Sequence, residues 1–155
     1  MRYILLDRIT VLEPPELARG IKCVSLSDDV FVDHFPGHPV MPGALILEAL
    51  AQLAGVLLEA TMRARGRSDL HALLTMVDRA KFRHVVRPGD RLELEARAIT
   101  TTEDGGQAQG WARVDGELAA EAQLSYAFAR VTNPVVLAKR REFLNIWLTG
   151  SAESP

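Results

Sequence analysis

A chain of 155 residues is the size of one domain and is long enough to bury an apolar core. It is 48% hydrophobic and 25% charged, as globular proteins are, and its net charge of −2 argues against broad nucleic-acid binding. The single cysteine, Cys23, excludes an intrachain disulfide and a cysteine-based zinc cluster, and we expect it to be a buried, inert thiol.

The chain is predicted to begin with β structure. Its first apolar run, residues 3–6, is too short for a signal-peptide core and is followed at once by charge, which favours a cytoplasmic protein. Residues 3–12 and 19–27 are rich in Ile, Leu and Val and predict two strands joined by a turn at residues 13–16. Three prolines and a glycine then predict an ordered loop over residues 29–42.

A long helix is predicted from Pro42 to about Arg65, where helix-forming residues dominate. Proline suits the start of a helix, and Gly66 suits its C-terminal cap. The helix is apolar on nearly all sides, so we expect it to be buried on nearly all sides. A transmembrane span would need roughly 20 apolar residues, and Glu48 and Gln52 interrupt this run.

The second half predicts antiparallel strands. Apolar and charged or polar residues alternate over residues 91–98 and again over 118–128, as in strands with one solvated face. Asp115-Gly116 between such segments predicts a tight hairpin. Two strands, a buried helix and about four further strands describe an α+β domain whose sheet wraps the helix. One sheet cannot enclose such a helix, so we expect a second subunit to complete the structure.

Candidate catalytic groups are concentrated in residues 33–52, DHFPGHPVMPGALILEALAQ. His34 lies in the proline-rich loop and can act as a general base near neutral pH; a solvated bystander is the alternative. Glu48 is costly to bury, and Gln52 lies one turn further along the same helix face, where it could orient Glu48 or a water. A structural Glu–Gln pair that holds the sheet backbone remains the alternative.

Gly43, at the start of the helix, offers a backbone N–H at the positive end of the helix dipole. Such a donor suits the oxygen of a thioester carbonyl that gains charge when the neighbouring proton leaves, although Pro42-Gly43 also simply starts the helix. A base, a carboxylic acid and an oxyanion donor are together the groups that α,β-elimination of water requires. His34 would remove a C2 proton, and Glu48 would protonate the departing C3 hydroxyl.

The segment from His34 to Gln52 resembles the signature of the FabZ-type 3-hydroxyacyl-acyl-carrier-protein dehydratases, which are related to the FabA type. Residues 5–8, 79–90 and the Asp115-Gly116 hairpin are also similar, so the resemblance covers roughly residues 3–130. Glu48 rather than aspartate, and Ala44 rather than cysteine, resemble the FabZ branch, which does not isomerise the product. The resemblance departs at the N-terminus, where the family usually has a further lead-in, so that an N-terminal contact near the site is expected to be missing or replaced. It also departs after about Arg130, where the chain extends beyond the usual end of the family.

The resemblance implies a hot-dog fold, conversion of (R)-3-hydroxyacyl to trans-2-enoyl groups, and no metal or cofactor. It implies a homodimer, possibly a trimer of dimers, in which His34 of one subunit faces Glu48 of the other. The partner is an acyl carrier protein with a phosphopantetheine-linked chain. Phe82 would help to line the acyl tunnel.

Arg79, Lys81 and Arg83 alternate in a predicted strand, so we expect them on one face, where they could contact the acidic carrier protein or the phosphopantetheine phosphate. A solvated strand face is the alternative. We divide the chain into a hot-dog dehydratase domain, residues 1–131, and a C-terminal extension, residues 132–155. The extension is predicted to hold an amphipathic helix that docks on the same domain rather than on a membrane or another partner.

Two other functions stay open. A hot-dog acyl thioesterase could use the same carboxylate to activate water, but it would not need His34 as a base at C2. Hydratases with an Asp-x-x-x-x-His site are disfavoured because that spacing does not occur. A non-catalytic acyl-binding subunit is the other alternative, although it would more naturally have lost His34 or Glu48. The acyl-chain length and the pathway are not predicted.

Overall fold

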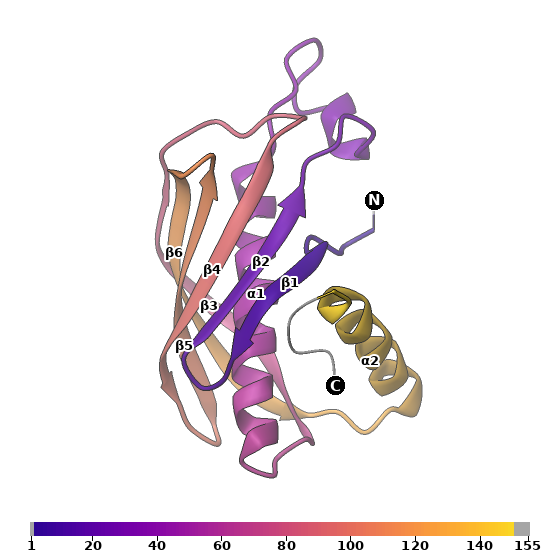
Figure 1. Ribbon diagram of the computed structural model, residues 1–155, viewed down its shortest axis with the longest axis vertical. Coiled ribbons are helices and arrows are strands. Elements are labelled where there is room, and N and C mark those ends of the chain that lie inside the picture. Colours follow the sequence, from indigo (N-terminus) through magenta and orange to yellow (C-terminus); the bar gives the residue numbers. More distant parts are fainter. Residues whose placement is uncertain (1, 151–155) are drawn as a thin grey trace.

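The computed structural model describes residues 2–150, which form one antiparallel sheet, a long helix against it and a second helix outside (Figure 1). The elements, in chain order, are β1 (Arg8–Glu13), β2 (Leu17–Cys23), the short 3-10 helix η1 (Asp29–Val32), α1 (Gly43–Ala64), β3 (Leu70–Phe82), β4 (Arg91–Thr101), β5 (Gly105–Val114), β6 (Glu117–Arg130) and α2 (Pro134–Leu148). The predicted order of two strands, a helix and four strands is confirmed.

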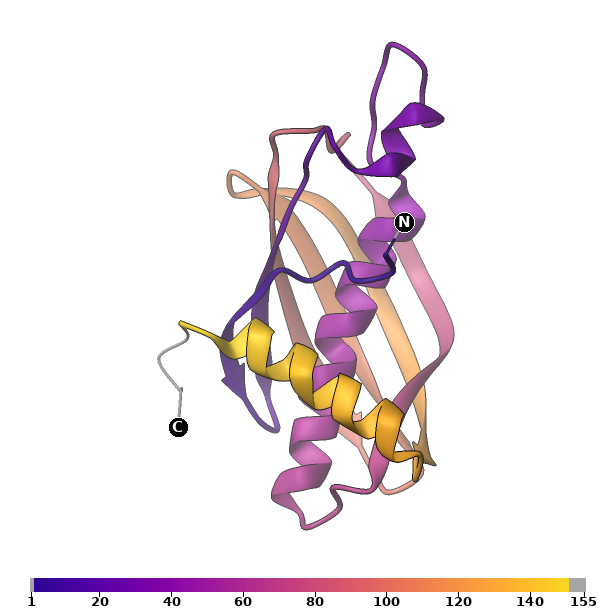
Figure 2. The same ribbon diagram turned by 90° about the vertical axis from the view of Figure 1, so that its right-hand side faces the viewer.

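The six strands lie in the order β1-β2-β4-β5-β6-β3, and all neighbouring pairs are antiparallel. The chain leaves β2 near one edge of the sheet, passes through α1 and returns as β3 at the opposite edge. The sheet therefore curves around the helix, as Figures 1 and 2 show. This is the hot-dog arrangement that the sequence predicts.

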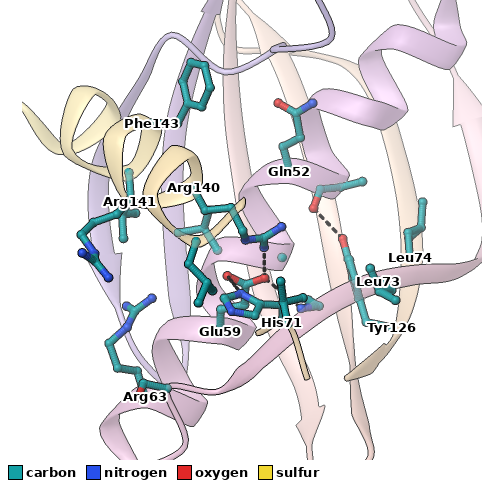
Figure 3. Close-up of a pocket in the computed structure, with 18 of the residues that line it drawn as sticks. Gln52, Glu59, Arg63, His71, Leu73, Leu74, Tyr126, Arg140, Arg141 and Phe143 are labelled. Atoms are coloured by element: carbon teal, nitrogen blue, oxygen red, sulfur yellow. Dashed lines mark hydrogen bonds and ion pairs between the residues drawn. The ribbon is translucent and has the colours of Figure 1, made fainter. Parts of the chain in front are cut away.

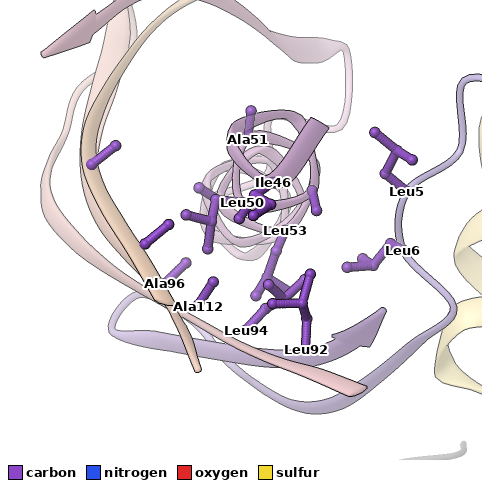
Figure 4. Packing of buried hydrophobic residues seen from close by; sticks show 14 of the residues in the cluster. Leu5, Leu6, Ile46, Leu50, Ala51, Leu53, Leu92, Leu94, Ala96 and Ala112 are labelled. Carbon is purple, nitrogen blue, oxygen red and sulfur yellow. The ribbon is translucent and has the colours of Figure 1, made fainter. Parts of the chain in front are cut away.

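The core lies between α1 and the concave face of the sheet. Leu50, Leu53, Leu57 and Leu58 of α1 are fully buried, and Figure 4 shows Leu50 and Leu53 directed toward β4 and β5. Burying a leucine side chain contributes about 1.5–3 kcal/mol, so this stripe is a large part of the driving force for folding.

The inner face of β5 consists of small residues, which let α1 approach the sheet closely. They are Gly106, Ala108, Gly110 and Ala112. A Cβ added at Gly106 would lie 2.9 Å from Leu58 Cδ2, and one added at Gly110 would lie 3.4 Å from Leu50. The bulky residues of the helix thus fill the space that β5 leaves empty.

Two predicted turns are confirmed. Gly66 follows α1 with a φ of +80°, the left-handed conformation that ends a helix and that glycine adopts without strain. Asp115 and Gly116, with φ angles of 50° and 83°, form the tight turn between β5 and β6.

Some details differ from the prediction. Residues 3–7 are not part of a strand, and β1 begins only at Arg8. Cys23 is exposed rather than buried, because the last residue of β2 directs its side chain away from the core. The outward stripe of α1, which includes Glu48, Gln52 and Val56, is only half-buried, because the sheet covers one side of the helix.

The helix α2 lies across the face of α1 that the sheet leaves open (Figure 2). It begins after Asn133, whose side chain accepts hydrogen bonds from the backbone N–H groups of Val135 and Val136. Residues 151–155 of the predicted extension lie outside the described residues. Within residues 2–150, α1 is the one helix long and apolar enough to cross a membrane, and it is the central helix of this fold.

Candidate active site

His34 is held by the loop between η1 and α1. Its Nδ1 lies 2.6 Å from the carbonyl oxygen of Val40, and the backbone N–H of Val40 donates back to the His34 carbonyl at 2.9 Å. A carbonyl oxygen only accepts, so Nδ1 must carry the proton in this contact. In the neutral ring Nε2 then holds the free lone pair, which is the state that a general base requires.

Glu48 is oriented by Gln52, as the sequence predicts from their spacing. The Gln52 amide nitrogen donates to Glu48 Oε1 at 3.0 Å. The backbone N–H of Leu5 donates to the Gln52 amide oxygen at 2.9 Å, and only the oxygen can accept this bond. The amide is therefore fixed with its NH₂ group toward Glu48.

The Glu48 carboxylate also affects two tyrosines. Its negative charge raises the pKa of the Tyr3 hydroxyl, with a smaller contribution from desolvation. Burial raises the pKa of Tyr126 strongly, and the charge of Glu48 adds to that shift. Tyr126 donates to the carbonyl of Ala51 at 2.7 Å, so both phenols stay protonated near neutral pH.

Gly43 and Phe82, two predicted site residues, are in contact. A Cβ added at Gly43 would lie 2.6 Å from Phe82 Cε1, so the ring would have to move aside for any other residue at this position. Phe82 is 53% exposed, and its ring covers the first turn of α1. The residue before the helix is Pro42, which offers no side-chain acceptor to the N–H groups of that turn.

Replacing Gly43 by alanine is therefore expected to displace the Phe82 ring and to lower the free energy of unfolding by up to about 1 kcal/mol, because a half-exposed ring can move aside. Urea denaturation measures the change. Gly55→Ala is the matched control, because a Cβ at that position of α1 meets its nearest atom at 3.7 Å and alanine favours a helix. Equal effects of the two substitutions would contradict the packing of Phe82 on Gly43.

A cavity of about 980 Å³ runs along the outward face of α1, between that helix, β3, β6 and α2 (Figure 3). Glu48 and Gln52 line it near one end and Glu59 and Arg63 near the other. His34, Gly43 and Phe82 are not among its lining residues. A single chain thus brings Glu48 and Gln52 together in the cavity and Gly43 and Phe82 together beside the helix start.

The sequence matches the family model of the FabA-like domain over residues 1–123, most of the chain. This protein belongs to the FabA-like family. The 3-hydroxyacyl-[acyl-carrier-protein] dehydratase FabZ of Campylobacter jejuni is 45% identical over 123 residues, 79% of this chain and 84% of that protein. FabZ of Bacillus velezensis is 43% identical over 125 residues, 81% of this chain and 86% of that protein.

Solved structures support the hot-dog fold of this FabA-like chain. The dehydratase heterocomplex ApeI:P from Xenorhabdus doucetiae superposes with a TM-score of 0.69 at 16% identity, covering 89% of this chain and 90% of that one. The protein smu.793 from Streptococcus mutans, solved with acetyl CoA, gives a TM-score of 0.65 at 11% identity and covers 84% of this chain and 94% of that one.

The predicted alternation of Arg79, Lys81 and Arg83 on one strand face is wrong. The pairing of β3 with β6 shifts register between Asp78 and Lys81, and Arg79 has a φ of 52°, so a bulge interrupts the strand there. Arg83 follows the end of β3 and pairs with Glu121 at 2.7 Å. All three cations are exposed, but they do not form the regular row that the sequence suggests.

A second polar cluster of this FabA-like protein, which the sequence analysis does not predict, lies at the end of the cavity away from Glu48. The Glu59 carboxylate accepts hydrogen bonds from the Arg140 guanidinium and from the backbone N–H of Ala72, the latter at 2.8 Å. His71 Nδ1 lies 3.4 Å from the other carboxylate oxygen. Neither ring nitrogen of His71 makes a hydrogen bond. The contact between His71 and Glu59 is an ion pair only when the His71 ring is protonated. The cluster ties α2 to α1 and β3.

Proposed function

We propose that this protein dehydrates (R)-3-hydroxyacyl groups on acyl carrier protein to trans-2-enoyl groups in fatty-acid or related acyl-chain biosynthesis. The observation that carries the proposal is the His34 ring, whose Nδ1 is bonded to Val40 so that Nε2 is left as a base. Relatives that share more than two fifths of their residues with this chain are named as dehydratases of this kind.

In the proposed reaction, His34 Nε2 takes the C2 proton of the thioester-linked chain. The N–H of Gly43 stabilises the negative charge that develops on the thioester oxygen. Glu48, in its protonated form, gives its proton to the C3 hydroxyl, the C3–O bond breaks and water leaves as the double bond forms. The proton on His34 returns to Glu48 through solvent, which restores the starting state.

We propose that the working unit is a homodimer in which His34 of one subunit acts with Glu48 of the other. Supporting this, the cavity that Glu48 lines does not include His34. In addition, β3 ends the sheet order and exposes an apolar run of Leu73, Leu74, Met76 and Val77. An apolar strand at a sheet edge is well suited to pair with a second copy of itself.

The proposed partner is the acyl carrier protein, and the exposed cations Arg79 and Lys81 are candidates for contact with its acidic surface or with the phosphopantetheine phosphate. Arg83 is a weaker candidate because it pairs with Glu121 at 2.7 Å, more closely than Arg79 lies to Asp78, at 3.9 Å. We propose that the protein is cytoplasmic, because its proposed substrate, an acyl group on acyl carrier protein, would be found there.

The test is a mass-spectrometric assay of the purified protein with a panel of (R)-3-hydroxyacyl carrier proteins of different chain length. Loss of one water from the acyl group, with the thioester intact, is the expected result. Release of free acid would instead indicate a thioesterase, and binding without turnover would indicate a non-catalytic acyl-binding subunit.

A further inference from the structure

The helix α2 lies beyond residues 1–123, the part of the chain that matches the family model, so the family relationship assigns it no role. It is nevertheless firmly attached. Arg140 pairs with Glu59 of α1, and Leu144, Trp147 and Leu148 pack against the core. Near its other end, the indole N–H of Trp147 donates to the carbonyl of Leu6 at 2.7 Å.

The segment that Trp147 contacts is the same one that orients Gln52. Leu5 and Leu6 are buried, yet this stretch belongs to no strand of the sheet. Leu5 donates its N–H to the Gln52 oxygen at 2.9 Å, and the Gln52 nitrogen donates to Glu48 and, at 3.3 Å, to the carbonyl of Tyr3. Two side chains therefore hold this segment: Gln52 binds the N–H of Leu5, and Trp147 binds the carbonyl of Leu6.

We infer that Trp147 is a positioning residue for the dehydration, an inference that rests on the proposed function. It fixes the segment Tyr3–Leu6, that segment fixes which way the Gln52 amide faces, and the amide places the Glu48 carboxyl. If this segment moves away, the Gln52 amide loses both contacts that distinguish its oxygen from its nitrogen, the N–H of Leu5 and the carbonyl of Tyr3. The Gln52 side chain can then rotate, and its NH₂ group no longer holds the Glu48 carboxyl in one position.

Trp147→Phe tests this inference, because it removes the N–H donor and keeps an aromatic ring in place. We expect kcat to fall about tenfold with KM within about twofold, since a misplaced acid affects the chemical step more than substrate binding. Ile146→Ala is the matched control on the same helix, with a side chain that is 53% exposed, and should leave both constants unchanged.

A double-mutant cycle separates positioning from a general loss of packing. If Trp147 acts through Gln52, Trp147→Phe should change kcat less than about twofold when it is added to Gln52→Ala, because coupled residues are not additive. A full tenfold loss in that background, or an unchanged kcat in the single variant, would overturn the inference.

Hydrogen exchange of the wild type gives a result even if the variant fails to fold. We expect the Leu5 amide and the Trp147 indole proton to be protected together; fast exchange of Leu5 in the folded protein would reject the positioning role. A wild type that dehydrates no substrate would refute the proposed function itself. An active wild type whose kcat is unchanged by Trp147→Phe would refute only this inference.

Discussion

His34→Ala is expected to lower kcat for dehydration by about 10³-fold, the usual contribution of a positioned general base. The reason is the fixed tautomer: Val40 occupies Nδ1, and Nε2 is the one ring nitrogen left to take the C2 proton. The measurement is the rate of enoyl product formation by mass spectrometry at saturating substrate. Because the Val40 contact is an internal loop bond, the free energy of unfolding should change much less than the rate.

His38→Ala is the matched control for this prediction. His38 lies in the same loop and exchanges backbone hydrogen bonds with Phe35, but its side chain is exposed. We expect its substitution to change kcat less than about twofold. Comparable losses for His34→Ala and His38→Ala would mean that the loop as a whole, and not the His34 ring, supports the reaction.

The fold was predictable because its elements carry local signals. The hairpin follows from Asp115-Gly116, whose φ angles only a few residue types adopt readily, and the helix end follows from Gly66. The bulge at Arg79 was not predictable, because alternation in the sequence continues through a residue whose backbone is left-handed. A bulge depends on the partner strand, and its position is not encoded in the bulged segment alone.

The identity of the candidate site residues was predictable from the sequence, but only some of the contacts between them were. The spacing of Glu48 and Gln52 placed them on one helix face, and their hydrogen bond is present. What orients Gln52 is Leu5, an apolar residue that contributes its backbone N–H from 47 positions away. Backbone groups carry no sequence signal, so neither this contact nor the bond from Trp147 to Leu6 could be foreseen.

Mixing two inactive variants is expected to restore activity if the site is shared between subunits. Glu48→Gln, which cannot protonate the leaving hydroxyl, should by itself lose about 10²–10⁴-fold in kcat. When it is unfolded and refolded together with an equal amount of His34→Ala, we expect about one quarter of wild-type activity. Random pairing makes about half of the dimers mixed, and each mixed dimer holds one intact site of two.

The control is each variant refolded alone at the same total concentration, which should remain inactive. If His34 and Glu48 of the same chain form the site, every site in the mixture lacks one of them and the mixture stays at the level of the single variants. The two outcomes differ by about 40-fold or more, so modest losses in refolding do not obscure the result. Recovery would establish that the Glu48-lined cavity and the His34 loop, which one chain does not bring together, meet across the dimer.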